Sequence, residues 1–297
     1  MIEVRDLIKT YGDRRVVDGL TFEVERGELF GILGPNGAGK TTTLEIVEGL
    51  RKADGGHVRL LGESPWPRNL DLCRRIGVQL QSSAFFEKLT ASEQLRTFGD
   101  LYGAPPSRAD DLLDRVGLAE AADTDTDDLS GGQKQRLSIA CTIVNDPEVV
   151  FLDEPTGALD PQARRNLWDL LEGLNESGRT VVLTTHSMEE AEVLCDRVAI
   201  VDGGRLLALD SPTNLVRRLD APVRIAVVTG SVDEREARTL AGVDDVEVDG
   251  DSITLISRDP APVLTELAAR TALDGLQVRG ATLEDVFLDL TGRAYRA

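Results

Sequence analysis

The stretch LFGILGPNGAGKTTTLEIVEGL, residues 29–50, limits the folds that this chain can adopt. Residues 29–33 are a continuous apolar run, which is typical of a buried parallel strand. A glycine-rich turn follows, and residues 41–50 then carry apolar side chains at helical spacing. A strand, a glycine-rich turn and a helix in this order predict an α/β fold with a phosphate-binding turn.

The turn GPNGAGKT matches the phosphate-loop pattern G-x-x-x-x-G-K-[ST] at every position. Its glycines allow backbone N–H groups to surround phosphate oxygens, aided by the N-terminus of the following helix. Lys40 supplies a positive charge to the β- and γ-phosphates, and the Thr41 hydroxyl is placed to bind Mg²⁺. We therefore expect a nucleoside triphosphate to be bound by Gly34, Pro35, Asn36, Gly37, Ala38, Gly39, Lys40, Thr41 and Thr42.

Two acids end a second apolar strand, in VVFLDEP. An aspartate at this position, Asp153, can hold the Mg²⁺ of a bound nucleotide, and Glu154 just beyond it can deprotonate the attacking water. His186 follows the next apolar strand, VVLTT, at the sheet edge where α/β proteins bind ligands. We expect His186 to contact the γ-phosphate and the water, although a lone histidine is more often structural.

The remaining pattern predicts two domains, residues 1–219 and 220–297. In the first domain, a helical insert at about 82–143 is preceded and followed in the sequence by strands, at 1–4, 20–28, 56–62, 149–152 and 180–185. Within the insert, Thr90 and Glu93 have the spacing of a capping box. After residue 220 the order strand, helix, strand, strand, helix, strand, with a turn at Asp249–Gly250, predicts a small ferredoxin-like α+β unit.

The composition excludes several classes of protein. The formal net charge of −19 argues against nucleic-acid binding, which requires a basic face. No run of 18 apolar residues exists, so membrane contact is expected only through a partner. Three widely spaced cysteines do not suggest a disulfide framework.

A third motif, LSGGQKQRL at residues 129–137, contains neither a nucleophile–base pair nor a cluster of metal ligands. Its serine hydroxyl and glycine N–H groups, at the start of a helix, are anion ligands. GPNGAGKTT, LSGGQ, VVFLDEP and TTH together, in this order, resemble the ATP-binding cassette (ABC) ATPases over residues 1 to about 215. The resemblance implies a P-loop NTPase cassette with a parallel-sheet core, an antiparallel β subdomain and a helical insert.

The resemblance also implies a homodimer formed through the nucleotide sites. In the family, each LSGGQ turn contacts the γ-phosphate held by the partner's phosphate loop, which assigns that contact to Ser130, Gly131, Gly132 and Gln133. Tyr11 matches the aromatic residue that stacks on adenine in the family. Asp160 matches the residue that contacts the partner subunit across the dimer. Gln81 matches the glutamine that approaches Mg²⁺ and water, with Gln79 as a less favoured alternative.

Membrane permease subunits are the other implied partners. They would dock on the helical insert, where Phe85 and Phe86 suit either a docking socket or the core. The ending ATLEDVFLDLTGR, residues 281–293, resembles ATPases of the drug-resistance, daunorubicin-type branch. We therefore expect an ATP- and Mg²⁺-dependent motor subunit of an exporter of drugs or other hydrophobic compounds. It would be peripheral to the cytoplasmic face of the cell membrane, and its C-terminal unit would support dimerisation or regulation.

Two alternatives remain open from the sequence. One is a soluble ABC ATPase that acts outside transport, on ribosomes or DNA. The other is a transporter ATPase for a different cargo, such as haem, a cation, a lipid or a polysaccharide.

Overall fold

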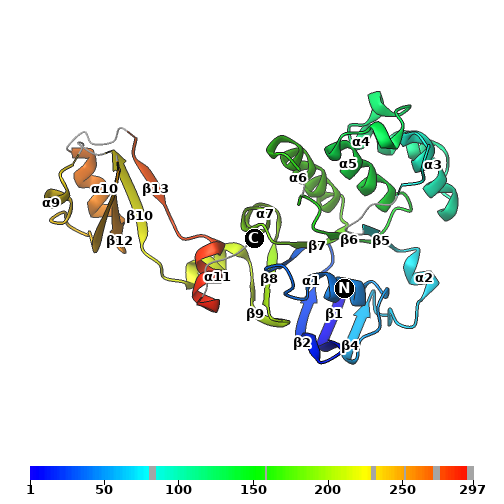
Figure 1. Cartoon of the computed structure of the whole chain (residues 1–297), viewed down its shortest axis with the longest axis horizontal. Coiled ribbons are helices and arrows are strands. Elements are labelled where there is room, and N and C mark those ends of the chain that lie inside the picture. Colours follow the sequence, from blue (N-terminus) through cyan, green and yellow to red (C-terminus); the bar gives the residue numbers. More distant parts are fainter. Residues whose placement is uncertain (80–84, 158, 229–231, 251, 270–274, 293–297) are drawn as a thin grey trace. The chain divides into compact units, whose positions relative to one another are not determined.

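The structure is a computed structural model that describes residues 1–79, 85–157, 159–228, 232–250, 252–269 and 275–292. The chain divides into two compact units after Pro212. This division precedes the boundary expected at residues 219 and 220, because helix α8 (Pro212–Arg218) groups with the C-terminal unit from Thr213 onwards. Both units contain helices and β-sheet (Figure 1).

The first unit contains a six-stranded sheet in the order β5-β6-β7-β3-β8-β9, parallel except for the antiparallel edge strand β9. Its strands are β3 (Leu29–Leu33), β5 (Ile76–Gln79), β6 (Val149–Asp153), β7 (Thr180–Thr185), β8 (Arg197–Asp202) and β9 (Arg205–Asp210). Every residue of β3, β6 and β7 is buried, as expected for central strands covered on both faces. The carboxyl ends of these three neighbouring strands therefore meet at one edge of the sheet.

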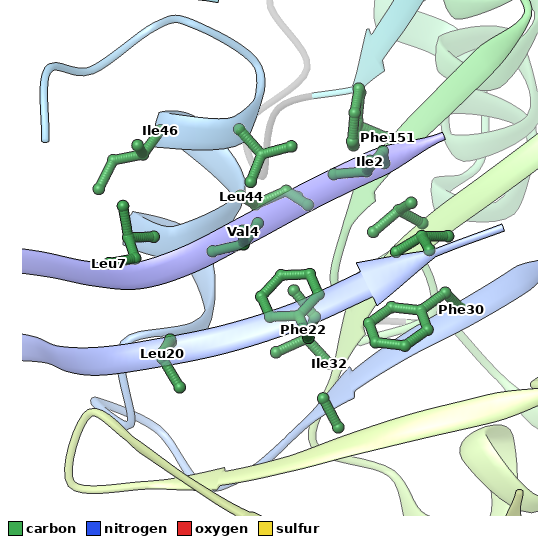
Figure 2. Packing of buried hydrophobic residues seen from close by; sticks show 14 of the residues in the cluster. Ile2, Val4, Leu7, Leu20, Phe22, Phe30, Ile32, Leu44, Ile46 and Phe151 are labelled. Atoms are coloured by element: carbon green, nitrogen blue, oxygen red, sulfur yellow. The ribbon is translucent and has the colours of Figure 1, made fainter. Parts of the chain in front are cut away.

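A three-stranded antiparallel sheet in the order β2-β1-β4 packs near this core. Its strands are β1 (Ile2–Tyr11), β2 (Arg14–Val24) and β4 (Gly55–Leu60). Figure 2 shows that β1, β2, β3 and α1 (Lys40–Val47) share one hydrophobic core. The rings of Phe22 on β2 and Phe30 on β3 stack with centroids 5.4 Å apart, so the two sheets are joined by direct packing.

The helical insert consists of α3 (Ala91–Tyr102), α4 (Ser107–Arg115) and α5 (Gly131–Thr142), which pack on one another (Figure 1). Two 3₁₀ turns, η1 (Ala119–Ala121) and η2 (Thr126–Asp128), connect α4 to α5. The capping box expected at the start of α3 is present, because the Thr90 hydroxyl accepts from the Glu93 N–H and the Glu93 carboxylate accepts from the Thr90 N–H. The other helices of the unit are α2 (Leu70–Cys73), α6 (Pro161–Glu176) and α7 (Met188–Leu194).

The C-terminal unit has the strand order β11-β12-β10-β13, with all neighbouring pairs antiparallel. Its elements are β10 (Val223–Val228), α9 (Glu234–Ala237), β11 (Asp245–Asp249), β12 (Ser252–Ser257), α10 (Pro260–Ala269), β13 (Gln277–Arg279) and α11 (Leu283–Thr291). This order and topology confirm the predicted ferredoxin-like unit. Alternate residues of β10 and β12, including Ile225 and Leu255, form its core with Val263 and Leu267 of α10.

Within the described residues, no helix has both the length and the apolar character needed to cross a bilayer.

Candidate functional site

The phosphate loop connects the end of β3 to the start of α1 and needs glycine for steric reasons. Gly39 has φ +100°, and a Cβ there would lie 2.5 Å from the carbonyl oxygen of Val16 on β2. A Cβ on Gly34 would lie 2.1 Å from the carbonyl oxygen of Val201 on β8. These two glycines therefore allow the backbones of β2 and β8 to pack directly against the loop.

A cavity of about 290 Å³ lies over this loop. It is lined by Arg14, Val16, Asn36, Gly37, Gly39, Lys40, Thr41, Thr42 and Glu154. All but Arg14 and Val16 are residues predicted to bind or hydrolyse nucleotide. Gly34, Pro35 and Ala38, also predicted, lie outside the lining; Ala38 is buried, and the other two offer their carbonyl oxygens to Lys40.

Lys40 is almost fully buried and its ammonium group is held by the loop itself. Its Nζ donates to the carbonyl oxygens of Gly34 at 2.8 Å and Pro35 at 3.2 Å. It also lies 3.2 Å from Oε1 of Glu154. The positive charge is thus fixed between the phosphate loop and the acid at the end of β6.

Asp153 ends β6 beside the start of α1. Its Oδ1 accepts hydrogen bonds from the hydroxyls of Thr41, at 3.2 Å, and Thr184. Burial raises the pKa of Asp153 above its ordinary value, and these two hydrogen bonds oppose the rise. A hydroxyl and a carboxylate oxygen side by side are the hard ligands that Mg²⁺ takes together with substrate phosphates.

Glu154 occupies a left-handed backbone conformation, with φ +48°, which is unfavourable for a residue other than glycine. Its N–H donates to the carbonyl oxygen of Thr184 at 3.2 Å and to the Thr184 hydroxyl at 3.0 Å, which holds it there. The carboxylate is thereby directed between two groups: Oε1 faces Lys40, and Oε2 lies 3.3 Å from Nδ1 of His186. The structure therefore brings the predicted base and the predicted histidine together at the cavity.

A buried carboxyl group behind these residues was not predicted from the sequence. Glu190 of α7 is fully buried, and Nε1 of Trp168 donates to its Oε1 at 3.2 Å. Burial raises the pKa of Glu190, while the side chains of Thr185 and Thr156 lower it. Since Thr156 follows Glu154 closely and Thr185 precedes His186, Glu190 links the two segments that carry the catalytic candidates. The second glutamate of HSMEE, three residues after Ser187, would have been its only sequence signal.

Tyr11 does not line the cavity. It ends β1 with 40% of its surface exposed, and its ring lies 5.5 Å from the Lys9 ammonium and 5.4 Å from the Arg51 guanidinium. Its register partner across the β1–β2 hairpin is Arg14, which does line the cavity.

The LSGGQ residues also lie outside the cavity lining, at the exposed start of α5. The Ser130 hydroxyl accepts from the Gln133 N–H at 3.3 Å, and the Gln133 side chain accepts from the Ser130 N–H at 2.8 Å. This capping box leaves the Ser130 hydroxyl hydrogen available as a donor. Asp160 similarly caps α6, because its Oδ1 accepts from the N–H groups of Gln162 and Ala163.

Gln81 lies outside the described residues, so the structure gives no position for it. The alternative glutamine, Gln79, is the last residue of β5 and is buried.

Family models match both parts of the chain. The model described as "ABC transporter" matches residues 17–157. The model described as "Nodulation factor export protein NodI, C-terminal domain" matches residues 232–292. The second match lies within the ferredoxin-like unit and the helix α11 that follows it.

Individual proteins are similar over the whole chain. The Nod factor export ATP-binding protein I of Ralstonia nicotianae is 42% identical, over 100% of this chain and 95% of that protein. The linearmycin resistance ATP-binding protein LnrL of Bacillus subtilis is 36% identical, over 100% of both chains.

Solved structures are similar to about 71% of the chain. The dimeric structure of MJ0796, a bacterial ABC transporter cassette, has a TM-score of 0.65 and 30% identity over 71% of this chain and 98% of that one. The same cassette in a post-hydrolysis state with ADP and Pi gives the same TM-score and identity. Together with the phosphate loop and the acids at the end of β6, these findings establish that the chain belongs to the ABC transporter family, as an ATP-binding and ATP-hydrolysing subunit of the branch that contains the Nod factor export and LnrL proteins.

Proposed function

We propose that this chain hydrolyses ATP with Glu154 as the general base and His186 as the group that orients the attacking water and the γ-phosphate. The observation that carries the proposal is the position of the Glu154 carboxylate, 3.2 Å from the Lys40 ammonium and 3.3 Å from His186 Nδ1, at the wall of the cavity. A base within reach of both the phosphate-binding lysine and an imidazole is well placed to accept a proton from water beside the γ-phosphate.

The backbone and side chains of the loop supply the rest of the phosphate site. Asn36, Gly37, Gly39 and Thr42 line the cavity, and the N-terminus of α1 opens towards it. Phosphoryl transfer depends mainly on positioning and charge neutralisation, which these N–H groups and Lys40 provide. We propose that Glu190, which is buried near Thr156 and Thr185, helps to preserve the spacing of the segments that carry Glu154 and His186.

Mg²⁺ fits the oxygen pair formed by Thr41 and Asp153, whose Oγ1 and Oδ1 atoms lie 3.2 Å apart. When bound, it neutralises charge on the β- and γ-phosphates. We propose that Thr41 and Asp153 hold it and that Gln81 approaches it from the start of the helical insert. Thr184 keeps the Asp153 carboxylate oriented through its hydroxyl.

The LSGGQ residues serve the site of a second copy. Ser130 and Gly131 are exposed and Gly132 is half-buried at the start of α5, and all three lie outside the cavity lining of their own chain. A Cβ on Gly131 would meet no atom within 4 Å, so a phosphate can approach the backbone closely there. The dimeric structure of a similar cassette supports closure of two copies into a homodimer. We propose that Asp160 lies near the partner in that dimer and that Tyr11 stacks on adenine.

The partners beyond the homodimer are integral membrane permease subunits, which place the chain at the cytoplasmic face of the membrane. Phe86 is 48% exposed and its ring lies 5.8 Å from that of Phe98 on α3, so the helical insert presents an aromatic surface for them. The names of similar proteins, Nod factor export and linearmycin resistance, support export of a drug or another hydrophobic compound. We propose that the C-terminal unit supports dimerisation or regulation.

The substitution Glu154→Gln tests the catalytic role. We expect the variant to bind ATP and to form ATP-dependent dimers, while its hydrolysis rate falls at least about 100-fold, because a general base contributes a factor of this order. Glu172→Gln, which makes the same change on an exposed residue of α6, is the control and should hydrolyse ATP normally. Full turnover by Glu154→Gln would exclude Glu154 as the base.

A further inference from the structure

Arg14 lines the phosphate cavity, but neither the loop pattern nor the LSGGQ and VVFLDEP motifs include it. It begins β2, next to the turn of the β1–β2 hairpin. Lys40 and Arg14 are the two cationic side chains of the described lining. Their surroundings differ, because the Lys40 ammonium already lies against the Glu154 carboxylate.

The neighbouring arginine provides a comparison within the same strand. Arg15 forms an ion pair with Oδ1 of Asp18 at 2.7 Å, and Arg205 pairs with the other oxygen of the same carboxylate at 2.8 Å. In the part of the chain that the structure describes, no carboxylate pairs with Arg14. On a chain with a net charge of −19, an arginine at a cavity wall without an acidic partner indicates that its partner is an anionic ligand.

The hairpin that carries Arg14 is fixed on the phosphate loop. The carbonyl oxygen of Val16 approaches both Gly39 and Gly204 so closely that a Cβ on either would lie 2.5 Å from it. Gly204 in turn donates to the carbonyl oxygen of Ala38 at 3.1 Å and accepts from the Asp18 N–H at 2.8 Å. The start of β2 is therefore attached to the loop through backbone contacts on two sides, which limits the motion of Arg14.

The guanidinium lies near the middle of the loop. Its Nη2 would be 3.8 Å from a Cβ built on Gly37, so the guanidinium lies beside the part of the loop that surrounds the phosphates. Tyr11, the residue proposed to stack on adenine, is the register partner of Arg14. A nucleotide that extends from Tyr11 to Lys40 consequently passes Arg14.

We propose that Arg14 is a phosphate-binding residue of the ATP site, whose guanidinium contacts oxygens of the β- or γ-phosphate. The proposal rests on the nucleotide site proposed above and adds a second cation to it. The planar N–H donors of arginine match phosphate oxygens in a bidentate geometry that lysine does not reproduce.

The test measures the binding of ATP, ADP and AMP, each with Mg²⁺, to the full-length chain by calorimetry. Arg14→Gln should raise the Kd for ATP about 10-fold, the size expected for loss of one charge-assisted hydrogen bond, and should leave the Kd for AMP unchanged. Arg14→Lys should recover part of the loss. A change for ATP alone assigns the contact to the γ-phosphate, and a change for both ATP and ADP assigns it to the β-phosphate.

Arg15→Gln is the matched control, because it removes the adjacent guanidinium that is already paired with Asp18. Wild-type affinity for all three nucleotides in Arg14→Gln, or an equal loss for AMP, would overturn the proposal. If the wild-type chain and Arg15→Gln failed to bind ATP at all, the nucleotide site itself would be wrong. Thermal midpoints without nucleotide check that the variants are folded.

Discussion

Glu48 follows the last residue of α1 and is the basis of a prediction on stability. It is 4% exposed, and neither of its carboxyl oxygens has a hydrogen-bond partner among the described residues. Burial raises its pKa to about 8, with smaller contributions from the charges of Asp153 and Glu45. A buried carboxyl group without donors is unfavourable when ionised, so the folded chain should retain this proton near neutral pH.

The direction of the pH effect follows from proton binding. Between the ordinary value of 4.5 and about 8, the folded chain holds the proton and the unfolded chain has released it. The folded state therefore binds more protons, and the free energy of unfolding falls as the pH rises through this window. At about 1.4 kcal/mol per pKa unit, the loss relative to acid pH is about 3 kcal/mol at pH 7 and about 5 kcal/mol by pH 9.

Glu48→Gln should remove this dependence, because the amide stays neutral at every pH. We expect the variant to resemble the wild type at pH 5 and to be more stable by up to about 3 kcal/mol at pH 7. Urea unfolding of the chain at half-unit steps from pH 5 to pH 9 measures the difference. Glu45→Gln is the control, since Glu45 is paired with Arg51 at 2.6 Å and its loss should not remove the slope. Parallel pH profiles of wild type and Glu48→Gln would refute the reasoning.

Two further substitutions test the loop and the exposed turn. Gly39→Ala should abolish ATP binding, because its Cβ would lie 2.5 Å from the β2 backbone. Gly178→Ala is the control: Gly178 also has a positive φ, but a Cβ there would meet no atom within 4 Å, so this variant should bind ATP normally. Calorimetry with ATP compares the two variants. Ser130→Ala should lower the free energy of unfolding by about 1 kcal/mol through loss of the cap and should also prevent ATP-dependent dimerisation. Thr90→Ala, the control, loses an equivalent cap on α3 and should still dimerise with ATP, as measured by light scattering. Equal dimerisation of Ser130→Ala and Thr90→Ala would argue against the role of Ser130.

The central strands could be predicted from the sequence because their environment imposes a local pattern. Residues 29–33 are an apolar run and residues 180–185 consist of valine, leucine and threonine, mostly β-branched, and they form β3 and β7 with the predicted bounds. The first helix of the C-terminal unit differs: the helical spacing of SVDEREARTLAG, residues 231–242, predicts a helix over the whole stretch, but α9 covers only Glu234–Ala237. Gly242 has φ +87°, and a Cβ there would lie 2.7 Å from the carbonyl oxygen of Asp259, so the chain turns at a glycine in a way that helical periodicity does not reveal.

The site was predictable where a motif is contiguous and was missed where distant segments meet. Lys40 and Thr41 follow from one loop, and the contact of Glu154 with His186 follows from neighbouring parallel strands. In contrast, YGDRRVV contains two adjacent arginines, and nothing local distinguishes them. Only the fold places Asp18 and Arg205 beside Arg15 and leaves Arg14 at the cavity.

The shared core of the two sheets has a consequence for hydrogen exchange. Phe22 of the hairpin strand and Phe30 of the loop strand stack, and both belong to one buried cluster (Figure 2). Neither the hairpin nor the strand before the phosphate loop can open without exposing that cluster, so the two form one cooperative unit. Backbone amides of β1, β2 and β3 should exchange with solvent at a common, slow rate. A nucleotide bound at the loop would consequently slow exchange along the whole hairpin, far beyond the residues that it touches.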